Sequence, residues 1–184
     1  MKPSRKDVLT IPNLLSLLRL LMIPLFVWLY LHGHDSWTAA VLILSGATDV
    51  VDGYIARHYN QVSDFGKAFD PVADKLTQAA MLLCLTTRHP AMLVPLILLV
   101  IKEIFAAVFG IIVIRRTGEV KGAEWHGKAA TMLLYGMMIL HVLWKDIPVW
   151  VSNTFNIGCV AMMLLSLVLY ARRNWQAIRS AAKE

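Results

Sequence analysis

Long apolar runs alternate with short polar segments along this chain of 184 residues. Six such runs cover about residues 14–33, 36–57, 66–87, 91–114, 127–144 and 149–170. Each is close to the ~20 residues that a helix needs to cross the hydrocarbon core of a bilayer. The pattern therefore predicts an all-α, polytopic membrane protein with six transmembrane helices, folded as a single membrane-embedded domain over residues 1–184.

Basic residues are distributed unevenly between these runs, and their distribution predicts the orientation. The formal net charge is +6, and most Lys and Arg residues lie before the first run, beside the turn between the second and third (Arg57 and Lys67), around the segment between the fourth and fifth, and after the sixth. By the positive-inside rule these segments face the cytoplasm, including an N-terminal segment (1–10) and a tail (171–184). We therefore expect an integral protein of the cytoplasmic (inner) membrane, in contact with the lipid bilayer and not with nucleic acid.

Four aspartates, Asp49, Asp52, Asp70 and Asp74, lie within the second and third runs. Spacings of three and four residues place each pair on one face of a helix. An ionisable group inside the bilayer costs roughly 2.5–3.5 kcal/mol on insertion scales, so it usually marks a functional site. Carboxylates select hard cations, and four of them suit two divalent ions, Mg²⁺ or Mn²⁺, that bind a diphosphate, with one carboxylate left to act as a base.

Two other interpretations of this cluster remain open. The carboxylates could relay ions or protons in a transporter, or they could be structural partners of Arg57, Lys67 and Lys75. Neither interpretation requires small residues at fixed distances from the aspartates.

The residues around the aspartates resemble a known signature. They read Asp49-x2-Asp52-Gly53-x2-Ala56-Arg57-x8-Gly66-x3-Asp70-x3-Asp74. This run is similar, position for position, to the signature of the CDP-alcohol phosphotransferases. The resemblance implies a homodimeric, six-helix membrane fold with a binuclear metal site. It also implies transfer of a phosphatidyl group from CDP-diacylglycerol to an alcohol, with release of CMP.

The same resemblance implies a role for each signature residue. Asp49, Asp52 and Asp70 are expected to be principal metal ligands, and Asp74 the base and a further metal ligand. The expected nucleotide-binding residues are Asp52, Gly53, Ala56, Arg57 and Gly66.

The start of the chain bears on the acceptor alcohol. Thr10-Ile-Pro12-Asn13-Leu-Leu-Ser16-x2-Arg19 resembles phosphatidylglycerophosphate synthases and the related transferase-type cardiolipin synthases. We therefore expect glycerol 3-phosphate as acceptor, with phosphatidylglycerol as the alternative and inositol, inositol phosphate or serine ranked lower. Lys102-Glu103 departs from the Arg-Glu common in these synthases, and Lys lacks the bidentate fork of Arg.

Several residues are candidates for binding the acceptor or its phosphate. They are Asn13, Arg19, Lys102, Arg115, Arg116 and Lys128. Arg19 has a second interpretation, in which it snorkels toward lipid headgroups. Arg115 and Arg116 could instead set the topology and contact anionic headgroups, and Lys102 could pair with an acid on another helix.

Overall fold

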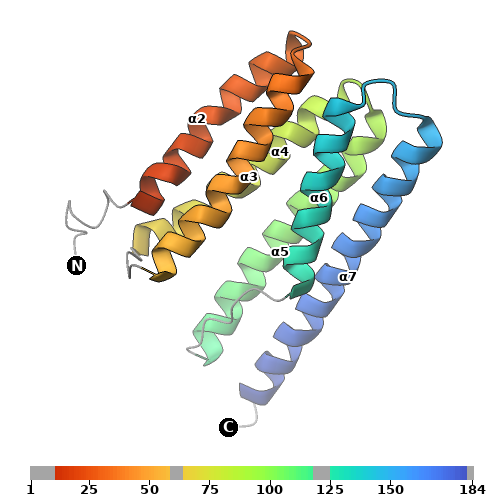
Figure 1. Cartoon of the computed structure of the whole chain (residues 1–184). Helices are drawn as coiled ribbons and strands as arrows, with labels where there is room; N and C mark the ends of the chain where they lie inside the picture. Colours follow the sequence, from red (N-terminus) through yellow and green to blue (C-terminus); the bar gives the residue numbers. More distant parts are fainter. Residues whose placement is uncertain (1–10, 59–63, 118–124, 182–184) are drawn as a thin grey trace. The chain divides into compact units, whose positions relative to one another are not determined.

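A computed structural model gives the fold of residues 11–58, 64–117 and 125–181 (Figure 1). These residues form α-helices and one short 3₁₀ helix, without a strand. The elements are α2 (Ile11–Leu31), α3 (Asp35–His58), α4 (Asp64–Thr86), η1 (Pro90–Met92), α5 (Leu93–Thr117), α6 (Trp125–Leu143) and α7 (Val149–Ala181). The all-α prediction is confirmed, and each of the six apolar runs corresponds to one α-helix.

The boundaries agree with the predicted runs to within a few residues, except at the end of the chain. The sixth apolar run ends near residue 170, whereas α7 continues to Ala181. The segment 171–181, predicted only as a tail, is therefore helical. Its residues are polar and basic, so hydropathy alone ended the predicted span too early.

The chain divides into two compact units. The first contains Met1–Arg88 and Met138–Lys145, and the second contains His89–Met137 and Asp146–Glu184. Helix α6 contributes to both. A single domain over residues 1–184 stays a prediction.

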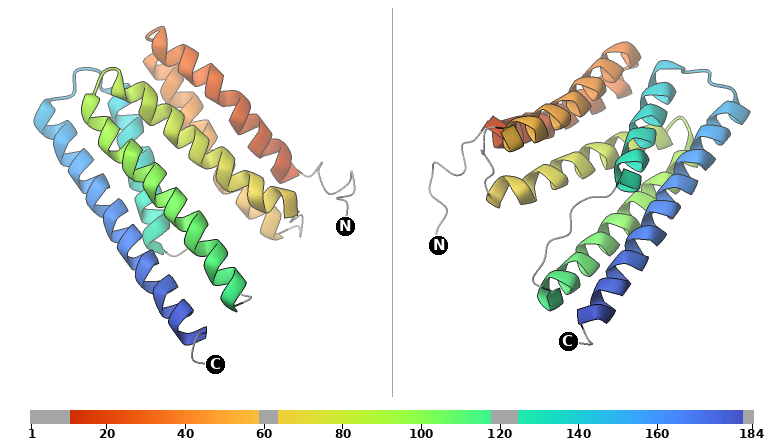
Figure 2. Two further views of the ribbon diagram at one scale, coloured as in Figure 1. Left: turned by 180° about the vertical axis from the view of Figure 1, so that it is seen from behind. Right: turned by 60° about the horizontal axis from the view of Figure 1, so that its bottom comes forward.

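In the first unit, α2 packs against both α3 and α4 (Figures 1 and 2). Helices α2 and α4 run parallel, because Ser16 and Asp70 meet near their beginnings, and Tyr30 and Arg88 meet at their ends. Helix α3 lies between them in sequence and runs in the opposite direction. The end of α3 therefore lies at the same end of this unit as the beginnings of α2 and α4.

The turn from α2 to α3 is a glycine C-cap. Gly33 has a φ of 76°, a left-handed conformation that a side chain disfavours. Its N–H donates to the Tyr30 carbonyl at 3.1 Å, and the His34 N–H donates to the Leu29 carbonyl at 2.9 Å. This Schellman pairing ends α2 and reverses the chain within a few residues.

Arg88 connects α2, α3 and α4 at the opposite end of the first unit from Asp70 and Asp74. Its Nη1 donates to Asp35 Oδ1 at 2.7 Å, in the first turn of α3, and its Nη2 donates to the Tyr30 carbonyl at 3.1 Å, at the end of α2. The guanidinium also lies over the Tyr30 ring, 4.2 Å from its centroid. Arg88 itself follows α4, so one side chain links the ends of three helices.

In the second unit, α5 and α7 run parallel with a constant register. Asn156 Nδ2 donates to the Ala91 carbonyl at 2.9 Å, and Tyr170 Oη donates to the Ala106 carbonyl at 3.4 Å. The partners are 65 and 64 residues apart, so the offset hardly changes along the pair. A buried contact of 3.0 Å between His126 Nδ1 and Ser166 Oγ joins the start of α6 to α7.

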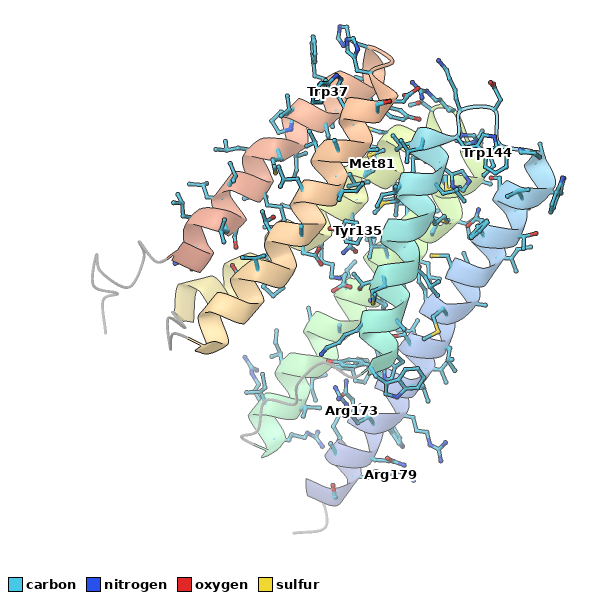
Figure 3. All side chains as sticks on the ribbon, in the orientation of Figure 1. Trp37, Met81, Tyr135, Trp144, Arg173 and Arg179 are labelled. Carbon is cyan, nitrogen blue, oxygen red and sulfur yellow. The ribbon has the colours of Figure 1, made fainter. Side chains whose placement is uncertain are left out.

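Three helices among the described residues are long and apolar enough to cross a membrane. They lie within Asn13–Leu31, Pro90–Arg116 and Val149–Ser180. The charged residues of α3 and α4 and the polar start of α6 lower the hydropathy of the other three predicted spans, which stay predictions. All six tryptophans are between 46% and 73% exposed, as expected for side chains at membrane interfaces; Trp37 and Trp144 are labelled in Figure 3.

We expect Arg88→Ala to destabilise the first unit, because it removes two charge-assisted hydrogen bonds that link helix ends. The cost should be about 1–3 kcal/mol, seen as a lower midpoint of thermal unfolding in detergent. Arg88→Lys should give an intermediate loss, since Lys keeps the charge without the fork. The exposed Lys145→Ala is the control, and equal midpoints for the two alanine variants would contradict this role.

Candidate active site

The inner face of α2 changes from polar to apolar along its length. Asn13, Ser16 and Arg19 are buried at its beginning, with exposed fractions of 6%, 0% and 0%. Their spacing of three residues keeps them on one face. Met22 and Phe26 then continue the buried face as apolar residues.

Helix α4 repeats this pattern. Asp70 is half-buried, Asp74 is only 8% exposed, and Thr77 and Gln78 are fully buried. Farther along the helix the buried side chains are apolar: Met81 (labelled in Figure 3), Leu82 and Leu85. Because α2 and α4 run parallel, their polar halves lie at the same end of the first unit.

Helix α3 also has a buried face, described from its beginning at the opposite end of the first unit to about its middle. Thr38, Leu42 and Ser45 are fully buried. Asp49 and Asp52 follow Ser45 by four and seven residues, positions that helical periodicity places on the same face. Their side chains lie outside the described residues, as do those of Ala56 and Arg57 and the surroundings of Gly53 and Gly66. The roles expected for these residues stay predictions.

Two buried polar side chains hold the described aspartates. Ser16 Oγ donates a hydrogen bond from α2 to Asp70 Oδ1. Gln78 Nε2 donates to Asp74 Oδ2 at 2.8 Å within α4. Each contact restricts the rotation of a carboxylate that would otherwise be repelled by its acidic neighbours.

Lys75 Nζ also lies 3.2 Å from Asp74 Oδ2. This pair matches one part of the structural interpretation, in which nearby cations neutralise the carboxylates. Lys75 is next to Asp74 in the chain and partly exposed, so the pair does not explain why Asp74 is itself buried.

Arg19 lies inside the first unit and does not snorkel. Its exposed fraction of 0% contradicts the interpretation in which its guanidinium reaches the headgroups. Arg19 is about one turn beyond Ser16, and Asp74 is about one turn beyond Asp70, so the parallel register brings both to a similar level. A buried cation at this level reduces the repulsion among the carboxylates. Contact with a substrate phosphate stays a prediction.

Sequence reasoning assigned no role in the site to four buried polar residues of the first unit. They are Ser16, Ser45, Thr77 and Gln78. Ser45 Oγ and Gln78 Oε1 have no hydrogen-bond partner among the described residues. The signal was available, because each of these residues lies at helical spacing from a residue of the signature or the opening motif. A buried polar atom without a partner is unfavourable unless water or a ligand binds it, so these two atoms indicate a site that receives one.

The described residues test the metal site only in part. Among them, no group of three or more His, Cys, Asp or Glu residues is placed to hold a metal ion. Only two of the four aspartates have described side chains. Both supply carboxylate oxygens, the donor type that Mg²⁺ and Mn²⁺ prefer, so the donor chemistry fits the predicted ions.

The other candidate acceptor-binding residues belong to the second unit. Lys102 Nζ lies 3.2 Å from Glu103 Oε1. The ion pair of Lys102 is therefore with the next residue of α5, whereas the alternative given above was an acid on another helix. Arg115, Arg116 and Lys128 are exposed. Their assignment to the acceptor stays a prediction. Cys84 and Cys159 are buried free thiols.

Several known proteins are similar to this chain. A "cardiolipin synthase (CMP-forming)" of Streptomyces coelicolor is 39% identical over 79% of this chain and 70% of its own length. A "CDP-diacylglycerol–glycerol-3-phosphate 3-phosphatidyltransferase" of Bacillus subtilis is 31% identical over 93% of this chain and 98% of its own length. A Pseudomonas fluorescens protein of the same description is 46% identical over 44% of this chain and 43% of its own length.

The model of one protein family matches almost the whole described chain. The match covers residues 9–177 and so includes the signature, the buried polar end of the first unit and both helices of the α5–α7 pair. Together with the candidate membrane-spanning helices, it identifies an integral membrane enzyme of phospholipid biosynthesis. The chain belongs to the CDP-alcohol phosphatidyltransferase family.

Proposed function

We propose that this enzyme transfers the phosphatidyl group of CDP-diacylglycerol to glycerol 3-phosphate, yielding phosphatidylglycerol phosphate and CMP. The observation that carries the proposal is the buried polar end of the first unit, where Asp70 and Asp74 lie on one face of α4 beside the polar face of α2. The Bacillus subtilis relative supports this acceptor, because its similarity extends over 98% of its length.

Phosphatidylglycerol is the second candidate acceptor. The Streptomyces coelicolor relative favours it, since that protein is named a cardiolipin synthase and shares 39% identity with this chain. The two reactions break the same bond in CDP-diacylglycerol, so the signature does not separate them. None of the three relatives described above is named for inositol, inositol phosphate or serine as acceptor, or for transport.

The proposed cofactors are two divalent cations, Mg²⁺ or Mn²⁺, held by Asp49, Asp52, Asp70 and Asp74. When bound, they would neutralise negative charge on the diphosphate and on the CMP leaving group. The chain's own part is to hold the carboxylates in place. Ser16 orients Asp70 from a neighbouring helix, and Gln78 orients Asp74 from the next turn of α4.

Asp74 is the proposed base. It would accept the proton of the acceptor hydroxyl while the oxygen of that hydroxyl forms a bond to the transferred phosphorus and the bond to CMP breaks. Asp74 is nearly buried, and its Oδ2 accepts from Gln78. Because the orientation of the carboxylate is fixed, it would accept the proton from an acceptor hydroxyl that approaches from one direction.

Two further groups of residues complete the proposed site. Asp52, Gly53, Ala56, Arg57 and Gly66 would bind the cytidine diphosphate part of the donor. Asn13, Arg19, Lys102, Arg115, Arg116 and Lys128 would bind the acceptor or its phosphate. Of this second group, Asn13 and Arg19 have the strongest support, because both are buried at the polar end of the first unit.

The enzyme is proposed to lie in the cytoplasmic (inner) membrane as a homodimer, with its active site facing the cytoplasm. The charge pattern supports the orientation, because Arg57 and Lys67, which flank the connection between the two aspartate-bearing runs, belong to the basic side of the chain. The homodimer is supported by the family resemblance alone.

The acceptor is tested by offering the purified protein CDP-diacylglycerol, Mg²⁺ or Mn²⁺, and one alcohol at a time. We expect CMP release and a lipid of the mass of phosphatidylglycerol phosphate with glycerol 3-phosphate. Cardiolipin formed from phosphatidylglycerol would select the second candidate. If the protein bound CDP-diacylglycerol but released no CMP with any of the alcohols, the proposed reaction would be overturned.

We expect Asp74→Asn to reduce kcat by at least about 10²-fold while leaving CDP-diacylglycerol binding nearly unchanged, because an amide cannot accept the proton. Turnover and binding of the donor are measured separately on the same preparation. Gln78→Leu, which removes only the hydrogen bond to Asp74, should give a smaller loss. Equal loss of turnover and binding in Asp74→Asn would remove its assignment as base.

We expect Ser16→Ala to weaken Mn²⁺ binding by about tenfold, because Asp70 loses the donor that orients it. The affinity is measured by electron paramagnetic resonance of free Mn²⁺, without substrate. Ser152→Ala, a change at a buried serine of α7 in the second unit, is the matched control. An unchanged affinity in Ser16→Ala would show that the contact with Asp70 does not orient a metal ligand.

A further inference from the structure

Helix α7 is longer than a membrane span requires. Its 33 residues correspond to about 50 Å at 1.5 Å per residue, whereas the hydrocarbon core is about 30 Å thick. The apolar part, 149–170, accounts for the core and contains no Lys or Arg. The last turns of α7 therefore extend through the headgroup layer on one side of the membrane.

The register of the second unit places further cations at the same level. Partners on α5 and α7 are offset by 64 to 65 residues, so Arg115 of α5 is level with Arg179 of α7. By contrast, η1 and the first turns of α5 contain no Lys or Arg before Lys102. The α5–α7 pair thus has one strongly cationic end, whereas at its other end neither helix contains a Lys or Arg residue.

One face of the α7 extension is exposed and basic. Arg172, Trp175 and Arg179 follow one another at spacings of three and four residues and are all exposed; we call them the basic–aromatic stripe. The Arg179 guanidinium lies 5.4 Å from the centroid of the Trp175 ring. Figure 3 shows Arg179 on the last turns of α7.

The opposite face of the extension is anchored in the second unit. Asn174 is 2% exposed and Ala177 is 5% exposed. The register brings these residues level with Gly110 and Val113 of α5, and Val113 is also buried. Because one face is packed, the stripe is held in a fixed direction and does not belong to a free tail.

We propose that the basic–aromatic stripe binds the headgroups of anionic phospholipids in the adjacent leaflet. Cations near a membrane surface are attracted by anionic lipid, and tryptophan favours the headgroup region. A rigid helix that crosses this region presents two guanidinium groups and one indole to it. The stripe has no apolar side chain besides the indole, so its charge complements an anionic headgroup and not the hydrocarbon core.

The test measures the contact of Trp175 with lipid. The full-length protein is reconstituted in bilayers that contain either brominated phosphatidylglycerol or brominated phosphatidylcholine at the same mole fraction. Bromine quenches indole fluorescence on contact, and the difference between the native protein and Trp175→Phe isolates the signal of Trp175. We expect brominated phosphatidylglycerol to quench this signal more strongly.

The matched control is Trp150, which is 73% exposed at the cation-free end of α7. Its signal, isolated with Trp150→Phe, should be quenched equally by the two lipids. In Arg172→Gln/Arg179→Gln, quenching of Trp175 by brominated phosphatidylglycerol should fall to the level given by brominated phosphatidylcholine, whereas Arg172→Lys/Arg179→Lys should keep the preference.

Equal quenching of Trp175 by the two lipids in the native protein would overturn the proposal, and so would a preference that survives the double glutamine change. The first comparison needs no arginine variant, so it decides the question even if the double variant cannot be purified. Absence of quenching by either lipid would likewise reject a lipid site. The readout is independent of catalysis.

Discussion

Buried charge inside a bundle of apolar helices needs partners from the bundle itself, since hydrocarbon supplies none. The first unit meets this requirement by dividing its interior into a polar end and an apolar end. Ser16 on α2 and Gln78 on α4 bind the carboxylates of Asp70 and Asp74, and Arg19 contributes a buried cation at nearly the same level. Without these partners, the aspartates would disfavour close packing of α2 and α4.

This division has a consequence for the first helix. Helix α2 lies outside the signature, yet it packs against both helices that contain the signature. Its polar residues Asn13, Ser16 and Arg19 complete the interior that α3 and α4 begin. The Arg88 contacts at the other end align the same three helices, so the arrangement of the carboxylates depends on residues more than a dozen positions away from them.

Much of this arrangement could be predicted from the sequence. Apolar runs of nearly constant length located the helices, since hydropathy and helix length are both set by the thickness of the membrane. The spacing of Asp70 and Asp74 correctly placed both on one face of α4. The signature identified the family, because small residues and carboxylates at fixed distances are difficult to explain by packing alone.

Other features depend on tertiary packing and could not be read from hydropathy. Arg19 occurs in an apolar run near a basic segment, and the same pattern fits a snorkelling side chain or a buried one; only the neighbouring helices decide. The helical state of residues 171–181 likewise depends on Asn174 and Ala177 packing within the second unit. In both cases the local sequence is compatible with two environments, and the contact that selects one of them comes from elsewhere in the chain.

The proposed donor and acceptor sides of the reaction differ in how the sequence encodes them. The residues proposed for the metal ions and the donor lie in one continuous stretch, Asp49 to Asp74. The residues proposed for the acceptor, such as Arg19, Lys102 and Lys128, are dispersed along the chain. A motif confined to one stretch can be recognised from its spacing, whereas a dispersed set of cations has no spacing to recognise. The signature therefore identifies the family without separating its reactions, and relatives named cardiolipin synthase and CDP-diacylglycerol–glycerol-3-phosphate 3-phosphatidyltransferase are both similar to this chain.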